Sequence, residues 1–122
     1  MSGATSAFDR LLPTEISRAE LSDPTLLLGG PDWSLSVTCE WRWVDPRGAV
    51  VSPATAGADD MVWNLVGDQI ESVEWSGPAA LGIDPLFHLR SGGILQVFSD
   101  ATFDTWVLHT PSLVLVGPLR DE

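Results

Sequence analysis

Strict alternation over eleven residues, from Trp33 to Trp43, is the feature that most constrains the fold of this chain. The odd positions are all apolar and the even positions are all polar or charged, in the order WSLSVTCEWRW. Because successive side chains of a β-strand point to opposite faces, this period of two predicts a half-buried strand with one solvent-exposed face. Antiparallel sheets produce such patterns, whereas parallel strands tend to be apolar throughout. We therefore expect a mainly β, antiparallel fold.

Turn signals divide the remaining sequence into further short strands. Asp45-Pro46-Arg47-Gly48 favours a turn that closes a hairpin onto Ala49–Ser52, and Ser91-Gly92-Gly93 marks a second hairpin. The other expected strands are short apolar segments between turns: Met61–Val66, Gln69–Trp75, Leu81–Ile83, Phe87–Arg90, Ile94–Phe98, Trp106–Thr110 and Leu113–Val116. About nine short strands predict a single antiparallel β-sandwich or a partly open barrel. At most one short helix is expected, in the lead-in over residues 1–13.

The chain also matches itself at an offset of 54 residues. Glu15–Leu35 aligns without a gap on Gln69–Leu89, with identity at seven of the 21 positions, whereas chance gives roughly one or two. Such a repeat indicates a duplicated structural unit, so we expect two pseudo-symmetric halves around one core. The alignment also favours a strand over a helix for Thr14–Leu21, because the matching Ile70–Trp75 has the composition of a strand.

A chain of 122 residues is long enough for one domain with its own core. We divide that domain, residues 1–122, into repeat one (about 14–52), a linker (53–60) and repeat two (about 68–110). Identical positions of the repeat are expected to be scaffold: Ile16/Ile70, Pro24/Pro78, Leu27/Leu81 and Leu35/Leu89.

The chain is strongly acidic, with 17 carboxylates against six arginines and a net charge of −11. Nucleic acids and anionic membranes bind basic patches, so this balance argues against both as partners. A basic protein is the partner that the charge favours. The absence of lysine, together with abundant Ala, Gly, Pro and Val, resembles proteins encoded by high-GC bacterial genomes.

The single cysteine, Cys39, cannot form an intramolecular disulfide, which fits a reducing compartment. The N-terminal sequence lacks the basic and apolar regions of a signal peptide, and no apolar run reaches the length of a membrane span. The expected location is the cytoplasm. Cys39 shares its predicted strand face with apolar residues, so we expect a buried, unreactive thiol rather than a nucleophile.

Acidic residues are concentrated in the middle of the chain. A stretch of 26 residues, 59–84, contains six acids and no base, and further acids follow at Asp100 and Asp104. They form either a negative surface that steers a basic partner or simply the charged edge of a sheet. Glu71 is expected to share a face with Val73 and Trp75, and Glu74 the opposite face with Ile70. The predicted partner-binding residues are Asp59, Asp60, Asp68, Glu71, Glu74, Asp100 and Asp104.

Six tryptophans offer a second kind of site. Trp41 and Trp43 lie two residues apart on one strand face, either as an aromatic platform for sugars and other flat ligands or, as we favour, as part of the core. Trp63 and Trp75 are less constrained. They are the predicted ligand-binding residues if the protein is instead a small-molecule or carbohydrate-binding module.

Catalytic signals are weak. Asp100 and Asp104 precede His109, and two carboxylates near a histidine could serve hydrolysis or bind a cation. The standard nucleophile-elbow, phosphate-loop, dinucleotide and zinc-protease motifs are absent, and two histidines with one cysteine do not have zinc-ligand spacing. We therefore expect no metal, no cofactor and no catalytic residues. His88, between Phe87 and Leu89, is expected on an exposed face beside Arg90.

The segment Leu89-Arg90-Ser91-Gly92-Gly93-Ile94-Leu95-Gln96-Val97, followed by Trp106-Val107-Leu108 and Pro111, resembles small β-rich bacterial domains, some of them similar to immunity proteins encoded beside polymorphic toxins. The resemblance covers residues 65–117 and carries no catalytic residues. It implies a non-catalytic inhibitor, and the acidity agrees with immunity proteins that block basic nuclease-like toxins. A binding or immunity protein is the first hypothesis, the small-molecule or carbohydrate module the second, and a hydrolase the third.

Overall fold

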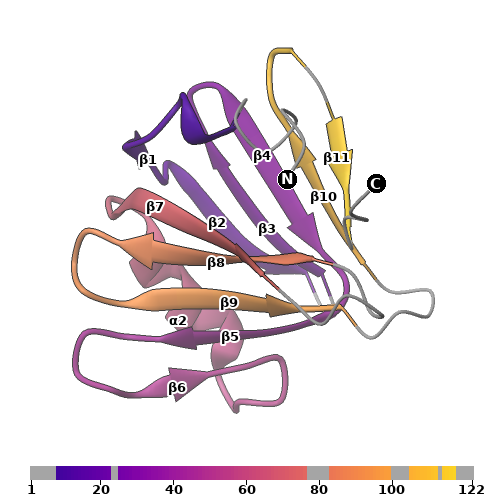
Figure 1. Ribbon diagram of the computed structural model, residues 1–122. Coiled ribbons are helices and arrows are strands. Elements are labelled where there is room, and N and C mark those ends of the chain that lie inside the picture. The colour runs from indigo at the N-terminus through magenta and orange to yellow at the C-terminus, as the bar shows by residue number, and fades with distance from the viewer. Residues whose placement is uncertain (1–7, 23–24, 77–82, 100–104, 113, 118–122) are drawn as a thin grey trace.

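Two antiparallel sheets face each other across one hydrophobic core (Figure 1). The computed structural model describes residues 8–22, 25–76, 83–99, 105–112 and 114–117. One sheet has six strands in the order β1-β7-β8-β9-β5-β6, and the other has five in the order β11-β10-β4-β3-β2. The predicted antiparallel sandwich is confirmed, with eleven strands in the described residues rather than about nine.

The six-stranded sheet consists of β1 (Thr14–Glu15), β7 (Gln69–Ser76), β8 (Asp84–Leu89), β9 (Ile94–Phe98), β5 (Glu40–Val44) and β6 (Val50–Val51). The five-stranded sheet consists of β11 (Val114–Val116), β10 (Trp106–His109), β4 (Trp33–Val37), β3 (Thr25–Gly30) and β2 (Arg18–Ser22). The predicted strands Gln69–Trp75, Ile94–Phe98 and Trp106–Thr110 are confirmed within a few residues, and both predicted hairpins are present. The predicted strand Thr14–Leu21 is instead divided into β1 and β2, which belong to different sheets.

The alternating stretch is not one strand but two. Trp33–Val37 forms β4 of the five-stranded sheet, and Glu40–Val44 forms β5 of the six-stranded sheet, with Thr38 and Cys39 between them. The alternation of burial continues through the bend, because the inner faces of both sheets point into the same core. A chain that passes from one inner face to the other keeps its period of two, so the pattern alone could not reveal the corner.

Four of the six tryptophans fill this core, as do four of the eight predicted scaffold positions, whereas Leu27 is only partly buried. Trp33, Trp41, Trp43 and Trp106 are at most 6% exposed. The repeat pairs Ile16/Ile70 and Leu35/Leu89 are buried as predicted, and Cys39 is buried too. Pro24, Pro78 and Leu81 lie outside the described residues.

The repeat does not give two matching units in the part of the chain that the structure describes. Glu15–Leu35 contributes β1 to one sheet and β2, β3 and β4 to the other, whereas Gln69–Leu89 contributes β7 and β8 to a single sheet. The two copies diverge after their equivalent isoleucines. The chain leaves the sheet after Ile16, but after Ile70 a β-bulge lets β7 continue in the same sheet.

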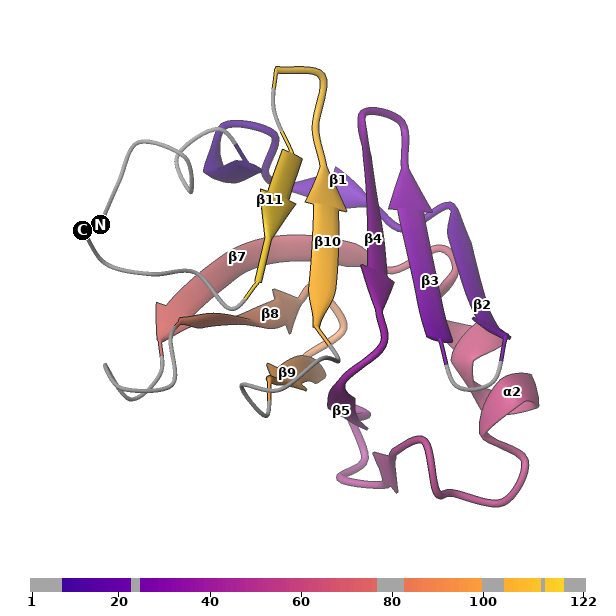
Figure 2. The same ribbon diagram turned by 90° about the vertical axis from the view of Figure 1, so that its right-hand side faces the viewer.

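The segment that joins the two halves contains helices, which corrects one prediction. Met61–Val66 was expected to be a strand, but α2 (Ala58–Met61) and the 3-10 helix η1 (Val62–Leu65) occupy residues 58–65. Ala58, Val62 and Leu65 are buried, spaced as one helical face that packs near β2. Figure 2 shows α2 beside β2.

The described part of the lead-in, from Phe8 onward, contributes to the core. Phe8 and Asp9 are helical, and Phe8 is fully buried with its ring edge-on to Trp33 and Phe87. Among the described residues, no helix is both long and apolar enough to cross a membrane.

Candidate binding surface

The outer face of the six-stranded sheet presents apolar side chains that no other described element covers. The inward positions of β8, β9 and β5 are buried, so the residues between them point away from the core. Strand pairing places Ile94 beside Val44, and Val44 beside Val50, in one row across the sheet. Leu86 lies in the next row, beside Gln96 and Arg42, and Phe98 lies one row further on, beside Glu40. We call these five residues the outer apolar patch.

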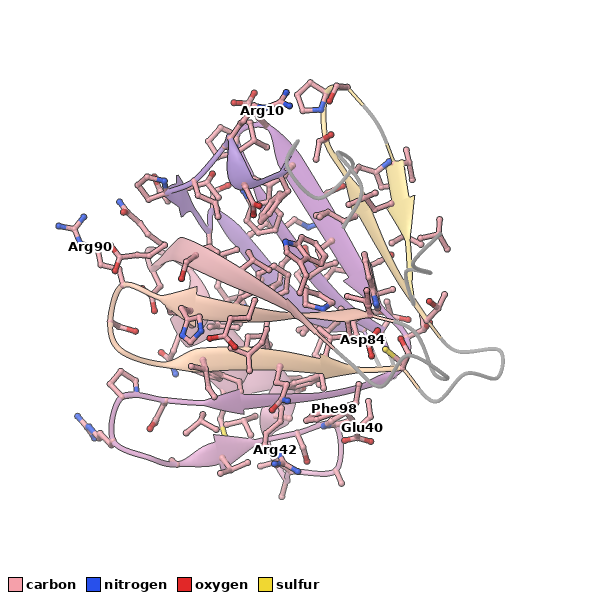
Figure 3. All side chains as sticks on the ribbon, in the orientation of Figure 1. Arg10, Glu40, Arg42, Asp84, Arg90 and Phe98 are labelled. Carbon is pink, nitrogen blue, oxygen red and sulfur yellow. The ribbon has the colours of Figure 1, made fainter. Side chains whose placement is uncertain are left out.

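Charged residues surround the outer apolar patch. Glu40 is the cross-strand neighbour of Phe98, and the Arg42 guanidinium lies 5.4 Å from the centre of the Phe98 ring, a cation–π distance. Figure 3 shows these three residues together where β5 and β9 run side by side. On the opposite margin Glu74 Oε1 lies 2.9 Å from His88 Nε2. The surface therefore has apolar side chains on both sides of the Gln96–Arg42 row, and acidic groups at two of its margins.

The outer face of the five-stranded sheet has a different composition. Val114 and Val116 on the edge strand β11 are more than half exposed. Between them and Leu27 of β3 lie Ser34 and Ser36 of β4. These serines interrupt the apolar side chains, so this face has no continuous apolar row comparable to the outer apolar patch.

The structure separates the predicted acidic residues instead of gathering them. Asp59 and Asp60 are exposed on α2, while Glu71 and Glu74 are exposed on β7. Figure 2 shows α2 beside β2, away from the C-terminal end of β7. Asp100 and Asp104 lie outside the described residues.

Asp68 is half-buried and holds two segments of the six-stranded sheet together. Its Oδ1 accepts hydrogen bonds from the backbone N–H groups of Gln69 (2.8 Å) and Ser91 (3.1 Å), and its Oδ2 accepts one from the Ser91 hydroxyl (2.5 Å). These bonds attach the start of β7 to the turn between β8 and β9. Asp68 thus has a structural role, and its predicted role in partner binding stays a prediction.

The prediction of which β7 side chains share a face is wrong, because a β-bulge between Ile70 and Ser72 shifts the alternation of inward and outward side chains. Ile70 pairs with Leu89, but the next pair is Ser72 with His88, so Glu71 is an extra residue. Beyond the bulge Val73 and Trp75 are partly buried on the core side together with Ile70, and Glu74 points outward. β1 pairs with β7 only at Gln69 and Ile70, so the remaining residues of β7 form the expected charged edge.

The two tryptophans predicted to bind a ligand lie on separate elements. Trp63 on η1 is 63% exposed. Trp75 on β7 is half-buried, packs 6.1 Å from Trp106 and donates a long 3.5 Å hydrogen bond to Asp9. Ligand binding at either residue stays a prediction.

The predicted catalytic group is only partly described. His109 is exposed on β10, opposite Ser34 of β4, and its proposed partners lie outside the described residues. His88 is partly exposed beside Glu74, as expected. No group of three potential metal-binding side chains is found within the described ranges.

Sequence reasoning missed the outer apolar patch, although a signal for it existed. β9, with the sequence ILQVF, is apolar at four of five positions instead of alternating. A strand of this kind in an antiparallel sheet has apolar side chains on both faces, and one of them needs a partner or stays exposed.

Searches of protein-family models, of curated proteins and of solved structures found no match to this chain.

Proposed function

We propose that this protein is a non-catalytic binding protein that docks on a basic protein through the outer face of its six-stranded sheet. The observation that carries the proposal is the outer apolar patch, flanked by Glu40 and Glu74. A cytoplasmic inhibitor of the immunity type is the form that the sequence resemblance favours.

The apolar centre supports docking because protein interfaces combine a desolvated core with a polar rim. Residues buried on such a contact contribute about 25 cal/mol per Å² of apolar surface removed from water. Phe98 and Leu86 are partly exposed, and strand pairing already fixes their backbone, so little backbone entropy would be lost on binding. Phe98 is the expected anchor, since aromatic residues dominate binding energy at interfaces.

The charge supports a basic partner. Glu40, Glu71 and Glu74 are exposed on this sheet, where Arg42 is engaged with Phe98. The net charge of −11 adds a long-range field that accelerates encounter with a positive protein. The expected partner therefore combines an apolar protrusion with surrounding lysine or arginine side chains.

A pair of charge reversals tests the docking face. The protein would be immobilised and exposed to an extract of the cells that encode it, and retained proteins would be identified by mass spectrometry, expressed and titrated. Glu40→Lys/Glu74→Lys should abolish retention of the partner. Asp59→Lys/Asp60→Lys changes the net charge equally but on α2, and should leave the dissociation rate nearly unchanged while slowing association.

The partner should be basic, and its affinity should fall as salt is raised, because exposed charges are screened. Phe98→Ala should weaken the titrated complex by about tenfold or more. An acidic partner, equal effects of the two charge-reversal pairs, or retention of no protein at all would each refute docking through this face.

A further inference from the structure

Three turns meet at one end of the six-stranded sheet and enclose a cavity of about 380 Å³. They are the turn between β5 and β6, the segment leading into β7, and the turn between β8 and β9, all at the left-hand end in Figure 1. The residues that line the cavity are mostly polar, with one tryptophan and one proline: Trp43, Asp45, Pro46, Arg47, Asn64, Asp68 and Ser91. Its volume is within the range of small-molecule sites.

Two carboxylates in the cavity are held in place by backbone hydrogen bonds. Asp45 Oδ1 accepts from the N–H groups of Arg47 and Ala49, both at 2.9 Å. Asp68 accepts from Gln69 and Ser91, as described above. These bonds fix both carboxylates before any ligand arrives, and Asp45 Oδ2 has no hydrogen bond to another described residue. Fixed acceptors reduce the entropy lost on binding.

Two donor groups complement these acceptors. Arg47 and Asn64 both line the cavity, and the side chain of neither has a hydrogen bond or ion pair with another described residue. Both residues are exposed, so their unsatisfied donors are available to a ligand. Trp43 is 6% exposed and supplies a rigid apolar wall.

The balance of charge selects the class of ligand. Two carboxylates and one guanidinium leave the cavity with a net charge of −1, so an anion would meet repulsion. A wholly apolar ligand would remove these polar groups from water without replacing their hydrogen bonds, which is costly. A neutral molecule with several hydroxyl groups can donate to Asp45 and accept from Arg47 and Asn64 at the same time.

From this geometry we infer that the cavity is a binding site for a neutral polyhydroxyl compound of the size of one sugar ring. Trp63 and Trp75 do not line it, so this site is distinct from the predicted tryptophan platform. It also lies in the turns at the end of the sheet, so it stands independently of the proposed docking face.

Nuclear magnetic resonance titration tests the site with named probes: D-glucose, D-galactose, D-mannose and myo-inositol, with glucuronate and glucosamine as charged analogues. At least one neutral probe should shift the Ser91 amide and the Trp43 indole N–H signals saturably. The Trp43 signal can be assigned with Trp43→Phe. The charged analogue that matches the best neutral sugar should bind more weakly.

Variants locate the contact. Arg47→Ala and Asn64→Ala should each weaken binding by about tenfold, the loss of one hydrogen bond to a polar ligand. Arg42→Ala removes the same charge from the outer face of the sheet and should leave the affinity unchanged. Amide spectra of the unliganded variants would show that the fold is intact.

The inference is overturned if no neutral probe shifts these signals at concentrations up to about 50 mM, a limit above the weakest useful affinity. It is also overturned if glucuronate or glucosamine binds best, or if Arg47→Ala and Arg42→Ala have equal effects.

Discussion

The tryptophans of the two sheets are buried to a similar degree, but their indole N–H groups differ in hydrogen bonding. In the five-stranded sheet, the Trp33 indole N–H donates to Thr14 Oγ1 (3.1 Å) and that of Trp106 donates to Asp84 Oδ1 (2.9 Å). In the six-stranded sheet, the indole N–H groups of Trp41 and Trp43 are buried without a hydrogen-bond partner among the described residues.

This difference in hydrogen bonding shows that tryptophan has two roles in the core, as a polar link between the sheets and as apolar volume. Thr14 and Asp84 belong to the six-stranded sheet, so Trp33 and Trp106 each form a polar link between the sheets. Trp41 and Trp43 contribute apolar volume, and each leaves a donor unsatisfied, at a cost of about 1–3 kcal/mol. Removing a polar link should therefore cost more stability than removing an unpaired indole nitrogen.

The largest expected effect is at Gly30, where the absence of a side chain lets Trp33 lie against the backbone. A Cβ at Gly30 would overlap the Trp33 indole and the Glu15 carbonyl oxygen. Gly30→Ala should therefore lower the free energy of unfolding by about 3 kcal/mol or more, measured by urea denaturation. The adjacent Gly29→Ala is the control, because its Cβ meets its nearest atom at an ordinary 3.6 Å. Equal stabilities of the two variants would contradict the close packing of Trp33.

A smaller but substantial effect is expected at Asp84. Its carboxylate accepts hydrogen bonds from the Ser99 N–H (2.9 Å), the Ser99 hydroxyl (2.6 Å) and Trp106. Asp84→Ala leaves these donors without their acceptor and should cost about 2–3 kcal/mol in thermal or urea unfolding. Glu74→Ala removes an exposed carboxylate and should change stability by less than about 0.5 kcal/mol. If Asp84→Ala were as mild, the link between the sheets would not matter for stability.

The smallest effect is expected for the unpaired tryptophan. Trp41→Phe removes ring volume and the unsatisfied N–H together, so the two contributions partly cancel and the net loss should be about 1 kcal/mol. Trp106→Phe removes similar volume but also one donor to Asp84, and should cost about 1–2 kcal/mol more. Paired calorimetric unfolding of both variants measures this difference. A larger loss for Trp41→Phe would reverse the comparison between the sheets.

Much of the fold could be predicted because local alternation and turn residues determine it. Trp33–Trp43 predicted the right burial for every residue, and Ser91-Gly92-Gly93 marked the right hairpin. The predictions that were wrong concern features that tertiary structure determines. The corner at Thr38 and Cys39 leaves the alternation unchanged, and the bulge at Glu71 shifts it without a sequence mark such as glycine.

The candidate sites were harder to predict than the fold. Acids near one another in sequence, such as Asp60 and Glu74, lie on different elements, since the chain between them folds into η1 and turns back into β7. The cavity combines Asp45 and Ser91 from two turns with Asn64 from η1, and only the tertiary structure brings these segments together. No local sequence pattern indicates that residues from such distant segments lie together.

The corner between β4 and β5 also has a kinetic consequence. β4 pairs with β10, and β5 pairs with β9, so one continuous segment pairs, in each sheet, with a strand at least 50 residues away in sequence. The chain loses the entropy of closing a long loop before the stabilising contacts between these strands form, and this slows the folding of β proteins. Because neither sheet can complete its centre alone, we expect a single rate-limiting step in which both assemble together, and amide hydrogens of β4 and β5 that exchange only through global opening.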